Sequence, residues 1–294
     1  MKIALAQLNY TIGDIDGNAN RIIEAVHRAE TEGADLVLFS EYAVSGTPAY
    51  DLLRKTTFLT LCEEALERIA AACRRVTAIV GSPILTDNGA VSAAAVLRQG
   101  RIVEIIEKQY ISARREMGFI EAGSGGKVVK IGGCNIAIYV GNDVAKVSEV
   151  DSNVDFVVNL NARRYGKGLL TSRYELMQRM TYRFGRNIIL VNQLGGSGDL
   201  VYDGMSGVMN RNSKLELILK DFEEDFRIYD TSANYAEMDA PFTSYEHRTH
   251  MLYRAACLGL RDYFLKSGYT KACVGLSGDI DSSFVACLAV GALA

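Results

Sequence analysis

Residues 2–41 read KIALAQLNYTIGDIDGNANRIIEAVHRAETEGADLVLFSE and contain two short apolar runs, at 2–7 and 35–39, with a helical pattern between them. The helical pattern places three apolar residues on one face: Ile22, Val26 and Ala29. Asn18 is suited to cap the start of this helix, and Gly33 is suited to end it. The stretch therefore predicts a strand, a helix and a second strand, the unit from which layered α/β proteins are built.

The same alternation continues through most of the chain. Further strands are predicted near residues 77–81, 91–98, 101–107, 127–131, 135–140, 155–160, 188–191, 205–210, 214–219 and 225–230. One helix is predicted over 58–75 and another over 169–184. The second is closed by Gly185 and has four residues facing inward: Leu176, Met177, Met180 and Phe184. Tiers of strands with helices outside them indicate an α/β domain.

The pattern changes around Ala240-Pro241, which we take as a domain boundary. A single helix follows, in which apolar residues recur at a spacing of four: Leu252, Ala256, Leu260 and Phe264. Beyond it, residues 272–276 read as a buried strand, followed by a polar turn and another helix. We therefore predict two domains, 1–240 and 241–294, of which the second is the first part of another α/β domain.

The composition excludes several classes of protein. Lysine plus arginine (32) nearly balance aspartate plus glutamate (35), and no basic run appears, so nucleic acid is not an expected partner. No uncharged apolar stretch reaches the length of about 18 residues that a membrane span needs, and no signal peptide is evident. The six cysteines lack CxxC spacing, which indicates free thiols in a reducing cytoplasm. No metal site is predicted.

Two ionisable residues stand at the ends of apolar strands. Glu41 ends the run LFSE, and Lys108 follows the strand expected at 101–107. Strand ends are where α/β folds gather reactive groups. A buried glutamate with a raised pKa can act as a general base, and a lysine can stabilise a developing oxyanion. The alternative is that the two side chains form a buried ion pair.

Several separated motifs, in order along the chain, carry a family resemblance. They are KIALAQLN at 2–9, GADLV at 33–37, SEYAVSGTP at 40–48, EKQY at 107–110 and VNQLGGSGDLVYDGMS at 191–206. The chain resembles, from end to end, the glutamine-dependent NAD synthetase family, whose amino-terminal glutaminase domain belongs to the nitrilase superfamily. The resemblance implies a nitrilase-like αββα sandwich followed by a truncated α/β fragment of ATP-pyrophosphatase type. It also implies homo-oligomers that pass ammonia internally to the synthetase site.

In this family a glutamate, a lysine and a cysteine hydrolyse glutamine through a thioester. The resemblance implies that Glu41 is the base and Lys108 the oxyanion residue, and it places a further family glutamate at Glu116. The nucleophile position corresponds to Gly141, where relatives end the strand in Cys-Glu-Asp and this chain reads GND. Glycine has no side chain with which to attack an amide.

A thiol elsewhere on the same strand does not replace the missing one. Cys134 lies seven residues before Gly141, or about 23 Å away along an extended strand. We expect Cys134 to be a buried core thiol.

The substrate-binding positions that the resemblance implies are Asn142, Arg163 and Lys167, and two neighbouring positions differ from the family. Relatives carry Ser-Pro where this chain has Arg163-Arg164, and Thr47 replaces a family tyrosine. The two guanidinium groups either attract an anionic ligand or are solvated surface groups.

The run GLSGDIDS at 275–282 resembles the phosphate-binding loop that opens the synthetase domain. The corresponding loop residues are Ser277, Gly278, Asp279, Asp281 and Ser282. Asp279 replaces a glycine, and a carboxylate about 4 Å from a phosphate opposes binding by roughly 4 kcal/mol per charge pair. ATP and magnesium, which the resemblance implies, are therefore predicted not to bind, and the glutaminase-like domain is expected to need no cofactor.

Three functional hypotheses follow. The first is a non-catalytic family member, kept as a binding or assembly module for glutamine or another small amide. The second is an active amidohydrolase that uses another nucleophile, such as water activated by Glu41, and the third is a regulatory subunit of an intact NAD synthetase. Since nothing after Ala294 completes a synthetase site, the chain is not expected to make NAD alone, unless 294 is only where the reading frame was cut.

Overall fold

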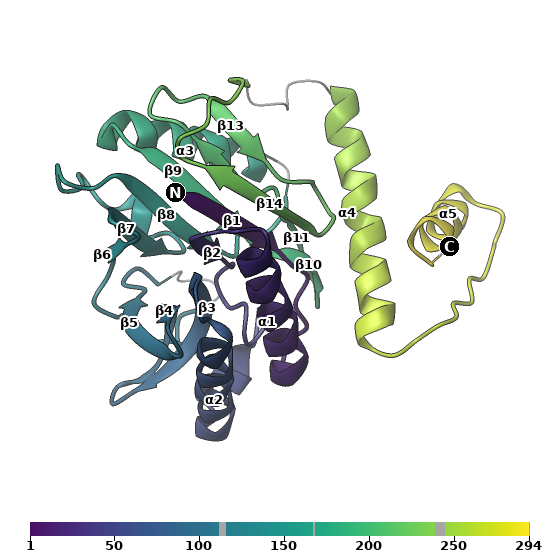
Figure 1. Ribbon diagram of the computed structural model, residues 1–294. Helices are drawn as coiled ribbons and strands as arrows, with labels where there is room; N and C mark the ends of the chain where they lie inside the picture. The colour runs from purple at the N-terminus through teal and green to yellow at the C-terminus, as the bar shows by residue number, and fades with distance from the viewer. Residues whose placement is uncertain (112–115, 167, 239–244, 294) are drawn as a thin grey trace.

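Two six-stranded sheets lie face to face in the computed structural model, which describes residues 1–111, 116–166, 168–238 and 245–293 (Figure 1). The first sheet contains, in spatial order, β14 (Asp225–Asp230), β1 (Lys2–Gln7), β2 (Leu36–Leu38), β3 (Thr77–Thr86), β4 (Gly89–Arg98) and β5 (Arg101–Glu107). The second contains β13 (Leu215–Ile218), β12 (Gly207–Met209), β9 (Asn187–Asn192), β8 (Phe156–Asn161), β7 (Cys134–Val140) and β6 (Lys127–Ile131). A separate hairpin pairs β10 (Leu194–Ser197) with β11 (Leu200–Asp203).

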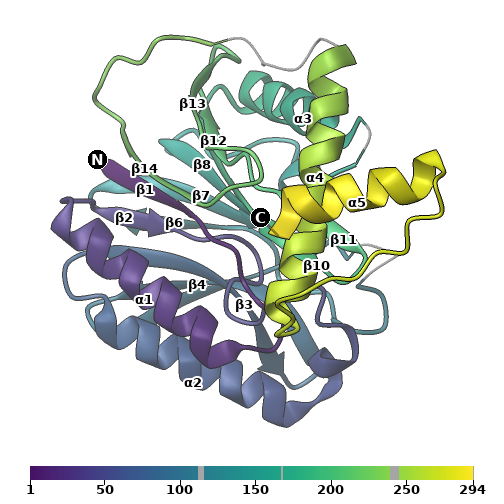
Figure 2. The ribbon, with the colours of Figure 1, turned by 90° about the vertical axis from the view of Figure 1, so that its right-hand side faces the viewer.

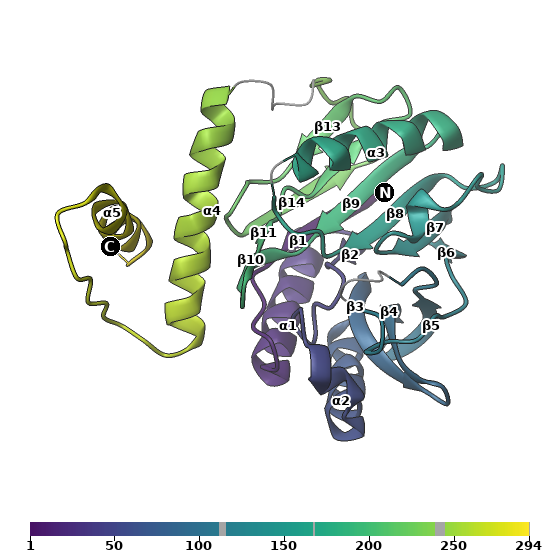
Figure 3. The same cartoon turned by 180° about the vertical axis from the view of Figure 1, so that it is seen from behind.

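Helices cover the outer face of each sheet (Figure 2 and Figure 3). The helices are α1 (Ile15–Thr31) and α2 (Thr56–Ala72) on the first sheet, α3 (Leu169–Phe184) on the second, α4 (Tyr245–Lys266) beside the hairpin and α5 (Ile280–Leu293) against α4. Two short 3-10 turns, η1 (Tyr50–Arg54) and η2 (Asp143–Ala145), complete the described elements. The α/β class predicted from the sequence is confirmed.

Side-chain alternation along the strands builds three apolar layers. In β1, Ile3 and Leu5 pack between the two sheets, whereas Ala4 and Ala6 pack under α1 and α2. Because both faces of each sheet are covered, the central strands read as continuous apolar runs rather than as alternating ones. The third layer lies under α3, whose predicted inward residues are all buried: Leu176, Met177, Met180 and Phe184.

The start of α1 differs from the expected cap. Asp14 is the N-cap, and its carboxylate accepts a hydrogen bond from the Gly17 N–H. Asn18 lies one turn inside the helix and is buried; its amide nitrogen donates to the carbonyls of Thr11 and Val44, and its side-chain oxygen accepts from the Thr11 N–H. Asn18 therefore fixes the loops beside the helix instead of the helix end.

This arrangement predicts an effect of removing the Asn18 amide. Asn18→Ala leaves buried backbone groups of Thr11 and Val44 without their partner, so we expect a loss of about 2 kcal/mol in the free energy of unfolding. Urea unfolding measures the loss. Asn20→Ala, an exposed position on the same helix, serves as the control and is expected to change little. An Asn18 variant as stable as the Asn20 variant would contradict the role assigned to the buried amide.

The helix after the predicted domain boundary buries a different face from the one expected. Leu252, first of the four residues expected on the buried face, is 52% exposed, and Ala256 is also exposed. The face turned toward the hairpin and second sheet instead contains Met251, Ala255, Leu258 and Asp262. The expectation was wrong because Asp262, a carboxylate, occupies a buried position that an apolar pattern does not mark.

The strand expected at 272–276 is also absent. These residues make no ladder within the described part of the chain, and Leu276 is 66% exposed. A strand forms only beside another strand that takes its hydrogen bonds, and none lies next to this segment in the residues described. Helix α5, on the far side of α4 from the sheets, forms as expected (Figure 1). Within the residues described, no helix combines the length and the apolar character that a bilayer span requires.

Candidate active site

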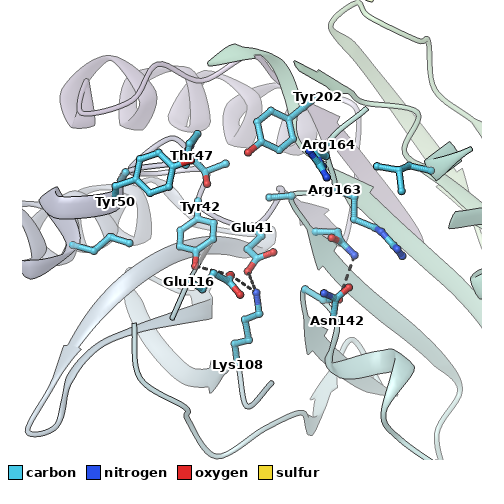
Figure 4. A pocket seen from close by; sticks show the side chains of 17 residues that line it. Glu41, Tyr42, Thr47, Tyr50, Lys108, Glu116, Asn142, Arg163, Arg164 and Tyr202 are labelled. Carbon is cyan, nitrogen blue, oxygen red and sulfur yellow. Dashed lines mark hydrogen bonds and ion pairs between the residues drawn. The ribbon is translucent and has the colours of Figure 1, made fainter. Parts of the chain in front are cut away.

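The residues predicted to be catalytic come from both sheets and meet at one end of the sandwich (Figure 4). Glu41 follows β2, Lys108 follows β5, and Gly141 follows β7. Close approach of the chain after β2 depends on Gly81 of β3, where a Cβ atom would lie 2.3 Å from the Ser40 carbonyl oxygen. Because no side chain fits there, glycine lets the Glu41 loop pack directly against the neighbouring strand.

Lys108 lies between two carboxylates. Its Nζ donates to Glu41 Oε1 at 2.9 Å and to Glu116 Oε1 at 2.5 Å. The Ser92 hydroxyl donates to Glu41 Oε1 at 3.0 Å, and the Tyr42 hydroxyl donates to Glu116 Oε1 at 3.2 Å. Glu41 and Lys108 are each only 3% exposed. The structure thus brings Glu41, Lys108 and Glu116 into one buried charge cluster.

The electrostatics of this cluster follow from burial. Desolvation raises the pKa of Glu41, although the Lys108 ammonium acts against the rise. Desolvation also pushes down the pKa of Lys108, but the two neighbouring carboxylates outweigh it and the pKa is raised. Lys108 therefore stays protonated, while Glu41 holds a proton more readily than an exposed glutamate does. A carboxylate in this condition is suited to general acid and base chemistry.

The raised pKa of Glu41 predicts a pH dependence of stability. The folded state keeps a proton on Glu41 over a pH range in which the unfolded state has released it, so the stabilisation present at low pH is lost as pH rises through the folded pKa. We expect Glu41→Gln to become more stable relative to wild type as pH rises above about 4.3, the pKa of an exposed glutamate. Urea unfolding across this range measures the difference.

Glu104→Gln provides a control of opposite sign. The pKa of Glu104 is lowered, chiefly by the hydrogen bond from Lys127, so the wild type should gain stability relative to this variant as pH rises toward about 4.3, the pKa of an exposed glutamate, and should gain no more above it. Parallel pH curves for the wild type and Glu41→Gln would disprove the expected burial effect on Glu41.

Gly141 lies against the charge cluster, at the expected nucleophile position. A Cβ atom there would be 2.7 Å from Lys108 Nζ and 3.1 Å from Glu41 Oε2. The backbone φ of Gly141 is +58°, in the left-handed region that favours glycine. Its N–H donates to the Leu160 carbonyl at 2.7 Å, and its own carbonyl accepts from Asn159 and Asn161. The Lys108 ammonium therefore occupies space next to the backbone that a side chain at Gly141 would need.

A cavity of about 260 Å³ opens above the cluster and is also lined by Asn142, Arg163 and Arg164. Thr47 lines it too and is buried. The Arg163 side chain is half-buried and extends away from Glu41 in Figure 4, which corrects its interpretation as a solvated surface residue. Desolvation, with repulsion from Arg173, lowers the pKa of Arg163. Lys167, the third expected substrate-binding residue, lies outside the described residues.

Sequence reasoning missed several residues that hold or line this site. Ser92, Tyr42 and Asn161 contact the cluster or the Gly141 loop, and Tyr202 lines the cavity. Ser92 could have been found from the sequence, because it carries the only hydroxyl within the apolar strand β4 and a buried hydroxyl needs a polar partner. The others depend on pairings between distant segments, which no local pattern marks.

The remaining predicted residues lie elsewhere. Cys134, expected to be a buried core thiol, is only half-buried and starts β7, at the opposite end of that strand from Gly141. The expected phosphate loop precedes α5. There the Asp279 carboxylate accepts from the Ser282 N–H at 2.8 Å, and Ser277 donates to the Ser282 hydroxyl at 3.1 Å.

Comparison with known proteins identifies the family. The carbon-nitrogen hydrolase family model matches residues 2–237, which is most of the chain. The chain belongs to the carbon-nitrogen hydrolase family. A second model, NAD synthase, matches residues 252–294, so the expected order of the two segments is confirmed.

Relatives of the chain confirm the resemblance to glutamine-dependent NAD synthetases. A glutamine-dependent NAD(+) synthetase from Xanthomonas campestris pv. campestris is 34% identical over 100% of this chain and 55% of its own length. The structure of a glutamine-dependent NAD+ synthetase from Acinetobacter baumannii, in complex with ADP, matches with a TM-score of 0.89 and 29% identity, covering 99% of this chain and 57% of that one. The chain spans about half the length of these relatives.

The nitrilase-like fold is confirmed separately. An amidase of the nitrilase superfamily from Nesterenkonia sp. AN1 matches with a TM-score of 0.68 and 21% identity, covering 78% of this chain and 91% of that chain. At this identity the likeness concerns the fold alone.

Proposed function

We propose that the chain binds a small amide, with glutamine as the first candidate, in the cavity above Glu41 and Lys108, and that it lacks the covalent step of hydrolysis. The observation that carries the proposal is the glycine at residue 141, whose Cβ position lies 2.7 Å from Lys108 Nζ and 3.1 Å from Glu41 Oε2. An atom attached there would touch both the base and the oxyanion residue. With glycine in place, the two groups contact each other and no thiol stands between them.

Glutamine is the first candidate because the relatives that match the whole chain are named for their dependence on it. The polar groups around the cavity suit an amide. Asn142 and Asn161 carry carboxamides, and the charge cluster supplies both an ammonium and carboxylate oxygens. These groups can donate to an amide oxygen and accept from an amide nitrogen.

Calorimetry and an ammonia assay on the full chain test this proposal together. Titration of L-glutamine is expected to give saturable heat, while incubation with the same ligand releases no ammonia above the uncatalysed rate. Glu41→Gln, which removes the carboxylate charge at the cavity floor, is expected to change the affinity. Absence of saturable heat with the wild type would refute binding.

A second candidate is an active amidohydrolase in which Glu41 activates water. The raised pKa of Glu41 favours this candidate, because a buried carboxylate with a pKa nearer neutrality is a more effective base. Wild-type ammonia release that disappears in Glu41→Gln would establish this candidate in place of the first. Release that survives the substitution would point to a contaminating enzyme.

The phosphate loop is proposed not to bind ATP or magnesium. In support, the Asp279 carboxylate accepts from the Ser282 N–H, an amide of the α5 amino terminus that a phosphate would otherwise approach. The loop residues therefore do not fit a phosphate, and no step of the proposed function uses a nucleotide. Equilibrium dialysis with ATP and magnesium is expected to show no retention.

Assembly completes the proposal. The chain is proposed to form homo-oligomers in the cytoplasm or to join an intact NAD synthetase as a regulatory subunit. In support of the second form, the glutamine-dependent NAD synthetases align over the whole of this chain, which covers about half of their own length. Light scattering of the purified chain measures the first form of assembly, and co-purification with a tagged full-length synthetase measures the second. A monomer that captures no synthetase would refute both.

A further inference from the structure

Arg164 stands at the mouth of the cavity above the charge cluster. It is exposed, and its guanidinium lies beside the Tyr202 ring, whereas the neighbouring Arg163 extends away from the cluster (Figure 4). Within the described residues, no carboxylate forms an ion pair with Arg164. A guanidinium in this position presents its fork of N–H donors to whatever enters the cavity.

The backbone holds Arg164 at this place from both sides. On one side, the Arg163 N–H donates to Asn192 Oδ1 at 2.8 Å, and Asn192 Nδ2 donates back to the Arg163 carbonyl at 3.1 Å. On the other side, the backbone of Arg164 forms an isolated antiparallel β-bridge with that of Tyr202, and the Tyr165 N–H donates to the Val201 carbonyl at 2.7 Å. The base of the Arg164 side chain is therefore fixed, and only its outer part can adjust to a ligand.

The Asn192 side chain is itself held by further buried hydrogen bonds. Its side-chain nitrogen donates to Asp203 Oδ1 and to the Gly204 carbonyl, and Asp203 pairs with the buried Arg173 at 2.7 Å. A chain of buried polar contacts thus runs from α3 to the cavity mouth. Positions anchored in this way lose little conformational freedom when a ligand binds.

The two ends of the cavity differ in charge. Among the residues described, the floor holds the Glu41 and Glu116 carboxylates, both paired with the Lys108 ammonium, so it offers acceptors and donors that suit a neutral amide group. The mouth holds the guanidinium of Arg164, which pairs in a bidentate manner with a carboxylate. A phosphate suits this floor less well than an amide does, because the Glu41 and Glu116 carboxylates accept hydrogen bonds and a phosphate is mainly an acceptor.

We infer that Arg164 determines specificity by binding the carboxylate of a ligand whose neutral amide end lies on Glu41 and Lys108. This inference rests on the proposed function, because it assigns the orientation of the amide that the cavity takes. The ligand class is an amide that also carries a free carboxylate. Glutamine bound with its side-chain amide inward and its α-carboxylate toward Arg164 satisfies both ends.

Calorimetry with two probes and three variants tests the inference on the full chain. The probes are L-glutamine and its α-amide derivative, in which the carboxylate is capped. Arg164→Gln is expected to weaken L-glutamine binding by about tenfold to a hundredfold and to leave binding of the α-amide unchanged. Arg164→Lys retains the charge without the planar fork and is expected to restore part of the affinity.

Arg101→Gln is the matched control, because Arg101 is an exposed arginine on β5 outside the cavity lining. It should bind both probes as the wild type does. Equal affinity of the wild type for the two probes, or an Arg164→Gln variant with unchanged affinity for L-glutamine, would overturn the inference and leave the proposed function standing. Preferential, Arg164-dependent binding of inorganic phosphate would overturn the carboxylate assignment. Failure of the wild type to bind either probe would overturn both proposals.

Discussion

Gly141→Cys is expected to release ammonia from glutamine at least about a hundredfold faster than the wild type, if the missing thiol is what stops the reaction. The new Cβ atom would meet Lys108 Nζ at 2.7 Å, so the flexible end of the lysine must shift slightly. The new thiol would then lie between an ammonium and a carboxylate. A positive neighbour lowers the pKa of a thiol, and an adjacent base can take its proton.

Two control variants separate the effect of a thiol at residue 141 from the effects of backbone strain, of Lys108 displacement and of a thiol placed elsewhere. Gly141→Ala imposes the same strain at a backbone φ of +58° and the same displacement of Lys108, but supplies no sulfur. Gly133→Cys places a thiol at another glycine of positive φ, where a Cβ meets nothing within 4 Å. Only Gly141→Cys should release ammonia in a continuous coupled assay, and alkylation of its thiol should stop the release. Equal rates for Gly141→Cys and Gly133→Cys would contradict a site-specific nucleophile.

Arg173→Met is expected to lower the free energy of unfolding by about 3–5 kcal/mol, because it leaves a buried carboxylate without its counter-charge. Arg173 and Asp203 are 1% and 0% exposed, and the Arg173 guanidinium also donates to the Gly204 carbonyl at 3.0 Å. Burial already raises the pKa of Asp203 despite the arginine beside it. Without Arg173, the folded chain must either hold a buried charge or keep Asp203 protonated.

Urea unfolding at neutral pH measures this loss. Arg179→Met on the same helix is the matched control, since the Arg179 side chain is 59% exposed and its pairing with Glu175 spans 4.0 Å. It should change stability by less than about 0.5 kcal/mol. The double variant Arg173→Met with Asp203→Asn should recover part of the loss, because the uncompensated charge is then gone. A single Arg173 variant as stable as Arg179→Met would disprove the assignment.

The strands and helices that carry the site are predicted accurately from the sequence, because their buried faces show a clear apolar periodicity. Strands such as β7 and helix α3 are buried over their whole contact face, so their apolar residues show the periodicity of the element. Helix α3 has the bounds expected, residues 169–184. Glu41, Lys108 and Gly141 follow strand ends, and so their convergence at one edge could be anticipated from the pattern and the family resemblance.

Features that depend on tertiary polar contacts were not predictable in this way. On α4, Asp262 faces inward because its carboxylate accepts from Asn9 Nδ2 and from the Gly196 N–H, each at 2.7 Å. A periodic pattern treats a carboxylate as a surface residue and therefore shifts the buried face. The sequence does not predict the hairpin β10–β11, because its first strand reads LGGS and lacks the β-branched residues that are typical of strands.

The segment at the cavity mouth is held by main-chain hydrogen bonds on both sides, through Asn192 and through Val201. None of these bonds involves the side chain of Arg164 itself. Mutations at that position can therefore accumulate over evolution without weakening the scaffold, so ligand preference can drift while folding is conserved. Diversification of this kind needs no compensating change elsewhere in the protein.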